Sequence, residues 1–240
     1  METNQQREWT LWAHAILAGV LVFVLSAGYL WARRWGMHFG DVAYKITFTG
    51  LAVAGTFLLS SSYAMGPLAR LVPRVFGNGT TLRKYYGMVG FGVIVVHVFW
   101  GLATLTPAHY PKFFHGETLT GNAMLFLMTG TLALILFLLV AVTSLKSVAQ
   151  FMPKVAWRAT QRLGYLALIV TLIHFGSVKY KGWMSMNDWP HVPETCNFLS
   201  SVPLPPLSFI LFLFIVFVFA LRILDSAMAR AVAKKQASTV

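Results

Sequence analysis

Six long apolar runs dominate the pattern of the chain, and short polar segments separate them. Each run is close to the roughly 20 residues that a helix needs to cross a bilayer. The runs cover approximately residues 11–31, 46–66, 87–106, 123–145, 163–179 and 205–223. This pattern predicts an all-α integral membrane bundle of six transmembrane helices.

Prolines stand near the ends of the apolar runs, at Pro67, Pro73, Pro107, Pro153, Pro203, Pro205 and Pro206. Because an interior proline removes a backbone hydrogen bond from a helix, we expect these positions to mark helix ends. The longest linker, about 180–204, is too short to fold on its own. We therefore expect a single transmembrane domain over residues 1–240, with its core at about 11–225.

Composition excludes a soluble globular protein. Residues are 57% hydrophobic and 11% charged, with a mean hydropathy of +0.67, whereas soluble domains carry about 25% charged residues. A formal charge of +12 would suggest nucleic acid on a soluble protein. Here the basic residues lie between apolar runs, so we expect a lipid bilayer and no nucleic acid as partner. The single cysteine, Cys196, excludes an intramolecular disulfide.

The Lys and Arg residues divide unequally between the two sides of the predicted bundle. One side, which includes both termini, carries thirteen of them. The other side carries Arg33, Arg34, Lys45, Lys112, Lys179 and Lys181. By the positive-inside rule both termini are expected in the cytoplasm, in a bacterial inner membrane. Arg33 and Arg34 oppose this rule locally.

Two histidines interrupt the apolar runs at nearly the same depth. His97 follows Lys84 by 13 residues, about 20 Å along a helix, and His174 follows Arg162 by 12 residues, about 18 Å. Both helices start on the inner side, so both imidazoles lie slightly past the midplane. An ionisable group inside a bilayer is costly and points to a functional site.

Small residues share the helical faces of both histidines. They are Gly87, Gly90 and Gly101 beside His97, and Gly164, Ala167 and Thr171 beside His174. One interpretation is close packing between helices, which small residues permit. The other is a smooth wall that leaves room for a flat ligand.

The residue types in the spans favour haem over other ligands. Zinc and copper sites use three or four ligands, often including carboxylates or Cys. The six predicted spans contain no Asp, Glu or Cys except at their ends. Haem iron accepts two axial imidazoles, and helical bundles build such sites from facing helices. The leading interpretation is one haem b ligated by His97 and His174 and lined by the six small residues. The alternative is that both histidines only form hydrogen bonds.

Two segments resemble the ferric-reductase-like transmembrane superfamily, and its bacterial single-domain members, the MsrQ-type haem subunits, are the most similar. The segments are "LRKYYGMVGFGVIVVHVF" and "AWRATQRLGYLALIVTLIHF", and the resemblance covers the core at about 11–225. It implies b-type haem and transmembrane electron transfer. His97 and His174 fall on the haem histidines of that family.

The chain departs from the family pattern at the inner side. Many members carry a second histidine 13 or 14 residues before each of these two, where this chain has Arg83 or Lys84 and Gln161. We therefore expect one haem, in the outer half. Gln161 and Arg83, with the nearby His14, Tyr85 and Tyr86, are candidates for a quinone or flavin site, or for packing and anchoring at the interface.

No GxGxxG or P-loop follows a predicted strand, so the chain lacks a recognisable NAD(P)H or flavin domain. We expect a membrane-embedded b-type cytochrome that serves as the electron-transfer subunit of an oxidoreductase system with a redox partner protein. Lys112, Lys179 and Lys181 are candidates to pair with haem propionates because they carry permanent charge. The alternative is a non-redox polytopic membrane protein, such as a transporter or assembly factor; a transporter would show broken helices and inverted repeats.

Overall fold

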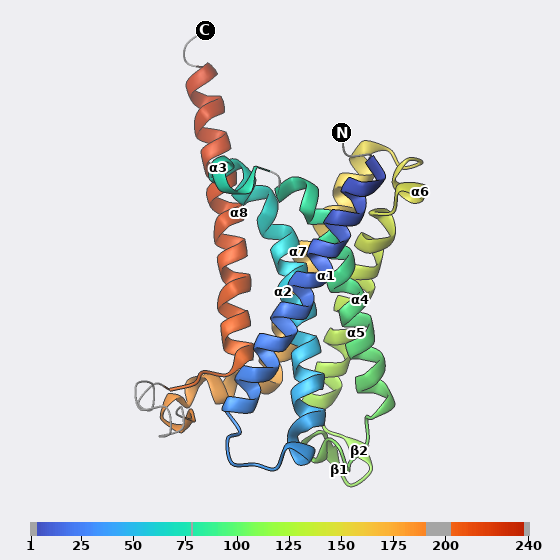
Figure 1. The fold of residues 1–240 in the computed structure, drawn as a ribbon, viewed down its shortest axis with the longest axis vertical. Helices are drawn as coiled ribbons and strands as arrows, with labels where there is room; N and C mark the ends of the chain where they lie inside the picture. The colour runs from blue at the N-terminus through green and yellow to red at the C-terminus, as the bar shows by residue number, and fades with distance from the viewer. Residues whose placement is uncertain (1–3, 78, 191–202, 238–240) are drawn as a thin grey trace.

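The computed structural model describes residues 4–77, 79–190 and 203–237. Six long helices form a bundle (Figure 1). They are α1 (Asn4–Ala32), α2 (Phe39–Leu71), α4 (Gly79–Ala103), α5 (Gly121–Thr143), α7 (Lys154–Met184) and α8 (Leu207–Ala237). The shorter elements are α3 (Pro73–Phe76), α6 (Lys146–Ala149), the 3₁₀ turns η1 (Pro111–Phe113) and η2 (Met186–Asp188), and the strands β1 (Phe114–His115) and β2 (Thr118–Leu119).

All six long helices are long and apolar enough to cross a membrane, which confirms the six predicted spans. Their ends differ from the hydropathy pattern in both directions. Helix α4, which forms the third predicted span, ends at Ala103, short of the predicted 106. The chain turns at Thr104, ahead of Pro107. In contrast, α7 begins at Lys154 and α8 continues to Ala237, because polar and basic residues extend both helices beyond their apolar runs.

The prediction that every proline marks a helix end is wrong for Pro67. This residue lies inside α2, one turn before its end at Leu71. Proline has no N–H group, so the carbonyl of Tyr63 loses its usual partner four residues on. Three other prolines do mark helix starts: Pro73 begins α3, Pro153 is the N-cap of α7, and Pro206 directly precedes α8.

Helix α2 is central to the bundle and packs on α4, α1 and α8, whereas α5 packs chiefly on α7. Helices α2 and α4 approach each other closely through glycines. A Cβ atom at Gly90 would lie 3.0 Å from the carbonyl oxygen of Gly55 and 2.9 Å from the backbone nitrogen of Leu59. Only glycine permits this backbone contact, as is common between membrane helices.

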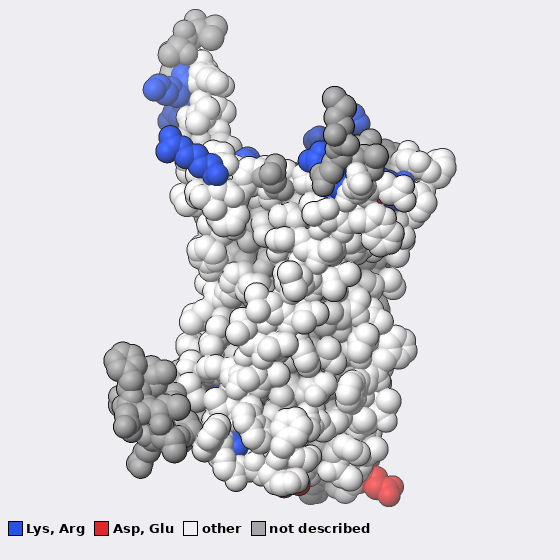
Figure 2. All heavy atoms as spheres, in the orientation of Figure 1, with Lys and Arg blue, Asp and Glu red and all other residues white. Residues whose placement is uncertain are grey.

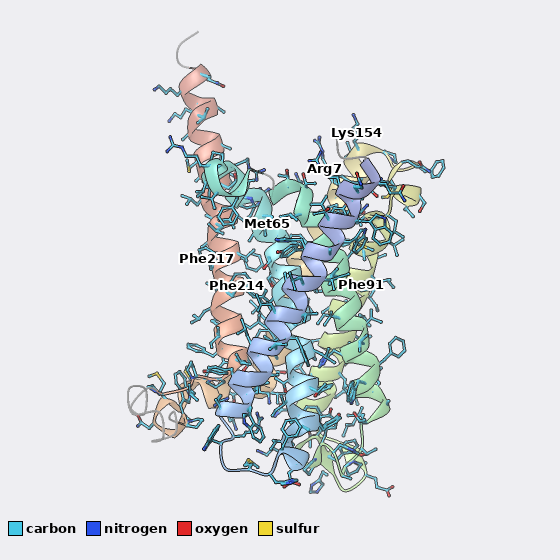
Figure 3. All side chains as sticks on the ribbon, viewed as in Figure 1. Arg7, Met65, Phe91, Lys154, Phe214 and Phe217 are labelled. Atoms are coloured by element: carbon cyan, nitrogen blue, oxygen red, sulfur yellow. The ribbon has the colours of Figure 1, made fainter. Side chains whose placement is uncertain are left out.

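Helix α8 covers one side of α2 and projects past the bundle at its C-terminal end (Figure 1). Phe214 points from α8 toward the bundle (Figure 3), where it stacks on Phe57 of α2 with ring centroids 4.7 Å apart. Nearer the end of α2, Arg70 forms a bidentate ion pair with Asp225 at 2.6 and 2.5 Å. These two contacts fix α8 against α2.

Helix α1 begins and α8 ends at the same end of the bundle (Figure 1). Lys and Arg side chains gather at that end, and the middle of the face shown in Figure 2 is uncharged. Arg7 and Lys154 both lie there (Figure 3). We call this the basic end, and the opposite end, which carries η1 and the β1–β2 hairpin, the loop end.

Candidate functional site

His97 projects from α4 toward α2. Its Nδ1 atom lies 3.1 Å from the carbonyl oxygen of Phe48, and its ring packs on the Phe48 ring with centroids 4.2 Å apart. A carbonyl oxygen only accepts hydrogen bonds, so Nδ1 carries the hydrogen. The backbone and the side chain of one residue therefore hold this imidazole.

His174 projects from α7 and makes the same two contacts with α5. Its Nδ1 atom donates to the carbonyl oxygen of Phe126 at 2.7 Å, and its ring stacks on the Phe126 ring at 3.8 Å. Gly130 provides the space, since a Cβ atom there would lie 2.7 Å from Cε1 of the imidazole.

The two histidine sites belong to two equivalent helical hairpins. Phe48 and His97 lie 49 residues apart, and Phe126 and His174 lie 48 apart. In each hairpin a short helix, α3 or α6, joins the long helices at the basic end. Because the two hairpins run in the same direction, they place both histidines at similar depth.

The hydrogen bonds at Nδ1 determine which nitrogen of each ring is available to a ligand. With the hydrogen on Nδ1, Nε2 carries a lone pair. No described residue forms a hydrogen bond with the Nε2 atom of either histidine. Among the described residues, the fully enclosed polar side-chain atoms without a partner are Arg33 Nε and Ser60 Oγ, so both Nε2 atoms retain some access from outside the protein. Metal-ligating histidines commonly donate their second nitrogen to a carbonyl in this way.

The small residues on the face of His97 mostly pack against α2. The room expected beside Gly90 is taken by Gly55 and Leu59, and the room beside Gly101 by the Phe48 ring, 3.0 Å from where a Cβ would lie. Gly101 thereby lets Phe48 reach His97. Gly87 lies near Ser62 and lines a cavity at the basic end.

The small residues on α7 also pack into the bundle. A side chain at Gly164 would overlap the Tyr63 ring, and Ala167 is fully buried in the core between α2 and α8. Thr171 is buried and donates to the carbonyl oxygen of Ala167 at 2.8 Å. Close packing between helices thus accounts for the three small residues on α7, as it does for Gly90 and Gly101. That the six small residues line a haem stays a prediction.

A cavity of about 310 Å³ opens between α2, α4, α5 and α7 toward the basic end. Its deep end is apolar, with Leu59, Phe91 and Phe137. Its outer part is polar and basic, and it is lined by Ser62, Tyr63, Arg70, Arg83, Lys84, Ser144 and Gln161. Small-molecule sites start at about 300 Å³, so this cavity accommodates one ring-sized group.

Arg83 and Gln161, the two residues predicted for a quinone or flavin site, line the same cavity, and their binding of such a ring stays a prediction. The Arg83 guanidinium lies over the Tyr63 ring, 5.3 Å from its centroid. Gln161 donates through Nε2 to the Val140 carbonyl and to the hydroxyls of Thr143 and Ser144, at 3.1–3.3 Å. These bonds hold the amide plane, and no described residue forms a hydrogen bond with the Gln161 Oε1 atom.

The other inner candidates lie elsewhere. His14 is exposed on α1, and its Nδ1 atom lies 3.4 Å from the hydroxyl of Tyr86. Tyr85 packs edge-on against Trp12. These three residues join α1 to α4 and do not line the cavity, which agrees with the anchoring interpretation.

Phe48, Phe126 and Gly130 are site residues that the sequence analysis missed. In both hairpins the residue four positions after the phenylalanine is small, Ala52 in α2 and Gly130 in α5. A small residue there exposes the phenylalanine carbonyl to a donor from the side. The spacing Phe-x-x-x-small, repeated 78 residues apart, is a weak signal that becomes meaningful only with the partner histidine.

A chain of ring contacts at the loop end, which we call the aromatic arc, joins the two phenylalanines that hold the histidines. Phe48 contacts Tyr110 at 6.0 Å, Tyr110 stacks on Phe113 at 5.6 Å, and Phe113 contacts Phe126 at 5.1 Å. Tyr44 adds hydrogen bonds to the hydroxyls of Tyr110 and Thr104, at 2.6 and 2.5 Å. The segment between α4 and α5 therefore contacts both phenylalanines that hold the histidines.

No family model and no curated protein matches this chain. Among the described residues, no group of three or more His, Cys, Asp or Glu side chains forms a metal-binding cluster. This finding concerns sites with three or more protein ligands, such as zinc sites. It does not concern axial ligation of a haem iron by two histidines.

Proposed function

We propose that this protein is a membrane-embedded b-type cytochrome that binds one haem b through His97 and His174. The observation that carries the proposal is the pair of Nδ1 hydrogen bonds to the Phe48 and Phe126 carbonyls. They leave one ligating nitrogen on each of two helices at similar depth. The resemblance of both histidine segments to the ferric-reductase-like superfamily is consistent with this function.

Bound haem would supply one-electron chemistry, and the residues of the chain would set its position. The carbonyls of Phe48 and Phe126 hold each imidazole in the tautomer that can ligate iron. The two phenylalanine rings restrict rotation of the imidazoles, and the aromatic arc separates the site from water at the loop end. Ligands held in this way need little rearrangement when the iron changes its charge.

We further propose that electrons reach this site from a quinol bound in the cavity at the basic end, with a reduced flavin as the alternative donor. Phe91, at the deep end of the cavity, precedes His97 by six residues, about 9 Å along α4. Arg83, Tyr63 and Gln161 offer polar groups to a carbonyl-bearing ring. A donor at this depth needs no second metal centre between itself and the histidines.

The orientation completes the proposal. The basic end lies in the cytoplasm and the loop end faces the outside, in a bacterial inner membrane. The protein then serves as the membrane component of an oxidoreductase system, and a redox partner protein receives electrons at the outer face.

The rival function is a non-redox transporter or assembly factor. Helices α4 and α7 are continuous through His97 and His174, and the two hairpins run in the same direction. Broken helices and inverted repeats, which are typical of many transporters, are not seen in these spans. This favours the cytochrome.

An absorption spectrum of the purified full-length protein tests the proposal. We expect the oxidised and dithionite-reduced spectra of a low-spin b-type haem, and a pyridine haemochrome yield of one haem per chain. Absence of haem from protein produced with ample haem precursor would refute the function. Two haems per chain would refute the single-haem arrangement.

A further inference from the structure

Four cationic side chains come together at the loop end. Lys179 lies five residues beyond His174 on α7, about 7.5 Å along the helix. It is close enough to Lys112, Arg33 and Arg34 for all three to repel it. Lys112 belongs to η1 and precedes Phe113, which contacts the Phe126 ring on which His174 stacks. Lys181 lies two residues further along α7, and residues two apart on a helix do not share a face.

This cation cluster, Arg33, Arg34, Lys112 and Lys179, lacks compensating charge within the described residues. The described ion pairs are Arg70–Asp225, Arg222–Asp225 and Glu8–Lys146, and all lie toward the basic end. Burial lowers the pKa of both Arg33 and Arg34. Arg33 Nε is enclosed and has no hydrogen-bond partner in the structure.

Such an arrangement costs free energy unless an anion is bound. Like charges held together repel, and an enclosed guanidinium nitrogen without an acceptor loses hydration that nothing replaces. Arg33 and Arg34 also oppose the positive-inside rule at this position. A ligand with two negative charges would remove both costs, because guanidinium groups bind carboxylates with paired hydrogen bonds.

We infer that the cation cluster binds the two propionate carboxylates of the porphyrin whose iron His97 and His174 ligate. The inference rests on the proposed function and adds a separate recognition site to it. Lys179 follows His174 on α7, Lys112 precedes Phe113 in the segment after α4, and the two arginines directly follow α1 and lie near Lys179. Three segments thus meet around Lys179, about 7.5 Å beyond His174 along α7 toward the loop end.

The test compares two porphyrins on the same full-length apoprotein in detergent. One is haem, and the other is haem dimethyl ester, in which both propionates are neutral. Soret titration gives the affinity of each, and the low-spin spectrum reports whether both imidazoles ligate iron. We expect the wild-type protein to bind haem about 10- to 100-fold more tightly than the diester, as for one or two hydrogen bonds to charged groups.

The variants Lys179→Gln and Arg33→Gln should each reduce this preference about threefold or more while keeping the low-spin spectrum. Lys181→Gln makes the same change of charge on the same helix outside the cluster, and it should leave the preference unchanged.

Each remaining outcome overturns the inference. Equal binding of both porphyrins by the wild-type protein, with the low-spin spectrum intact, would overturn it and leave the proposed function standing. An equal loss of the preference for haem in Lys181→Gln would overturn it too, because the preference would then come from the overall positive charge of the loop end and not from the cation cluster. Failure of the wild-type protein to bind either porphyrin would overturn both the inference and the proposed function.

Discussion

His174 donates its Nδ1 hydrogen to the carbonyl of Phe126 at 2.7 Å and stacks on the ring of the same residue at 3.8 Å. One residue on a neighbouring helix therefore fixes both the direction and the plane of the imidazole. His97 has the same relationship with Phe48. Two histidines that served only as interhelical hydrogen-bond donors would not need an aromatic ring beneath each of them.

Replacement of either histidine by glycine should remove haem, and added imidazole should restore it. In His97→Gly and His174→Gly the lost ligand leaves a space that free imidazole can enter. We expect loss of the low-spin spectrum in both variants and its partial return with imidazole in the buffer. His109→Gly is the matched control: His109 bonds to Thr106 on the exposed segment after α4, and its loss should not change haem content. Full haem retention in both ligand variants would contradict the assignment.

Gly130→Ala should disturb the site although it removes no functional group. The new methyl would lie 2.7 Å from Cε1 of His174, so the imidazole must move from its position on Phe126. Overpacking of this kind costs about 1–3 kcal/mol, and we expect a lower melting temperature and a broadened haem spectrum. Gly92→Ala, on α4 with open space around it, should be neutral or stabilising by up to about 1 kcal/mol. Equal behaviour of the two variants would show that His174 does not depend on the space beside Gly130.

Hydropathy alone predicts the six spans because each apolar run must satisfy its backbone hydrogen bonds within a helix. The depth match of His97 and His174 follows from counting residues at a fixed rise per residue. The helix against which each glycine packs could not be predicted from the sequence. Gly90 and Gly101 lie on the His97 face in sequence, yet they contact α2, since facing helices cannot be identified from one helix alone. Gly130 and Phe126 lie in a run with no polar periodicity, so only the partner helix reveals their function.

Pro67 shows the same limit for secondary structure. Local propensity ends a helix near a proline, but tertiary packing continues α2 to Leu71. The residues after Pro67 stay helical while Arg70 holds Asp225 of α8 at 2.5–2.6 Å. A contact with a residue 155 positions away cannot be anticipated from neighbours in sequence.

Gln161→Ala should separate electron delivery from haem binding. Gln161 lines the cavity at the basic end and precedes His174 by 13 residues, about 20 Å along α7, so its loss should leave the haem spectrum unchanged. We expect slower reduction of haem by a quinol analogue, by about tenfold, because a hydrogen-bonding group for the ring is lost. Gln150→Ala, at the end of α6 outside the cavity lining, is the control. Unchanged stopped-flow reduction rates with both a quinol and reduced flavin would refute the proposed cavity function.

The proposed orientation predicts the activity of reporter fusions. Alkaline phosphatase folds only outside the cytoplasm, so a fusion after Val240 should be inactive, and a fluorescent protein there should fluoresce. Phosphatase inserted at Gly116, in the turn of the β1–β2 hairpin, should be active because this turn lies at the opposite end of the bundle. An active phosphatase after Val240 together with an inactive one at Gly116 would invert the topology and place the histidines nearer the cytoplasm.

The aromatic arc at the loop end should weaken at high pH through Tyr110. Burial, together with the hydrogen bond to Tyr44, raises the pKa of Tyr110 to about 12, against about 10 in an unfolded chain. Between these values the folded protein keeps a proton that the unfolded segment releases. The stabilisation is thus complete below pH 10 and is lost as the pH rises toward 12. Because Tyr110 is partly exposed, solvent screening limits the effect to about 1–2 kcal/mol.

Limited proteolysis of the segment 104–120 as a function of pH measures this loss, and ultraviolet difference absorbance follows tyrosinate formation in parallel. In wild-type protein, cleavage should increase together with tyrosinate formation above pH 10. Tyr110→Phe cannot ionise and loses the hydrogen bond to Tyr44, so its cleavage should be faster at neutral pH and nearly independent of pH. Tyr180→Phe removes an exposed tyrosine of α7 and should retain the wild-type pH dependence. A wild-type pH profile in Tyr110→Phe would show that another group controls the loop end.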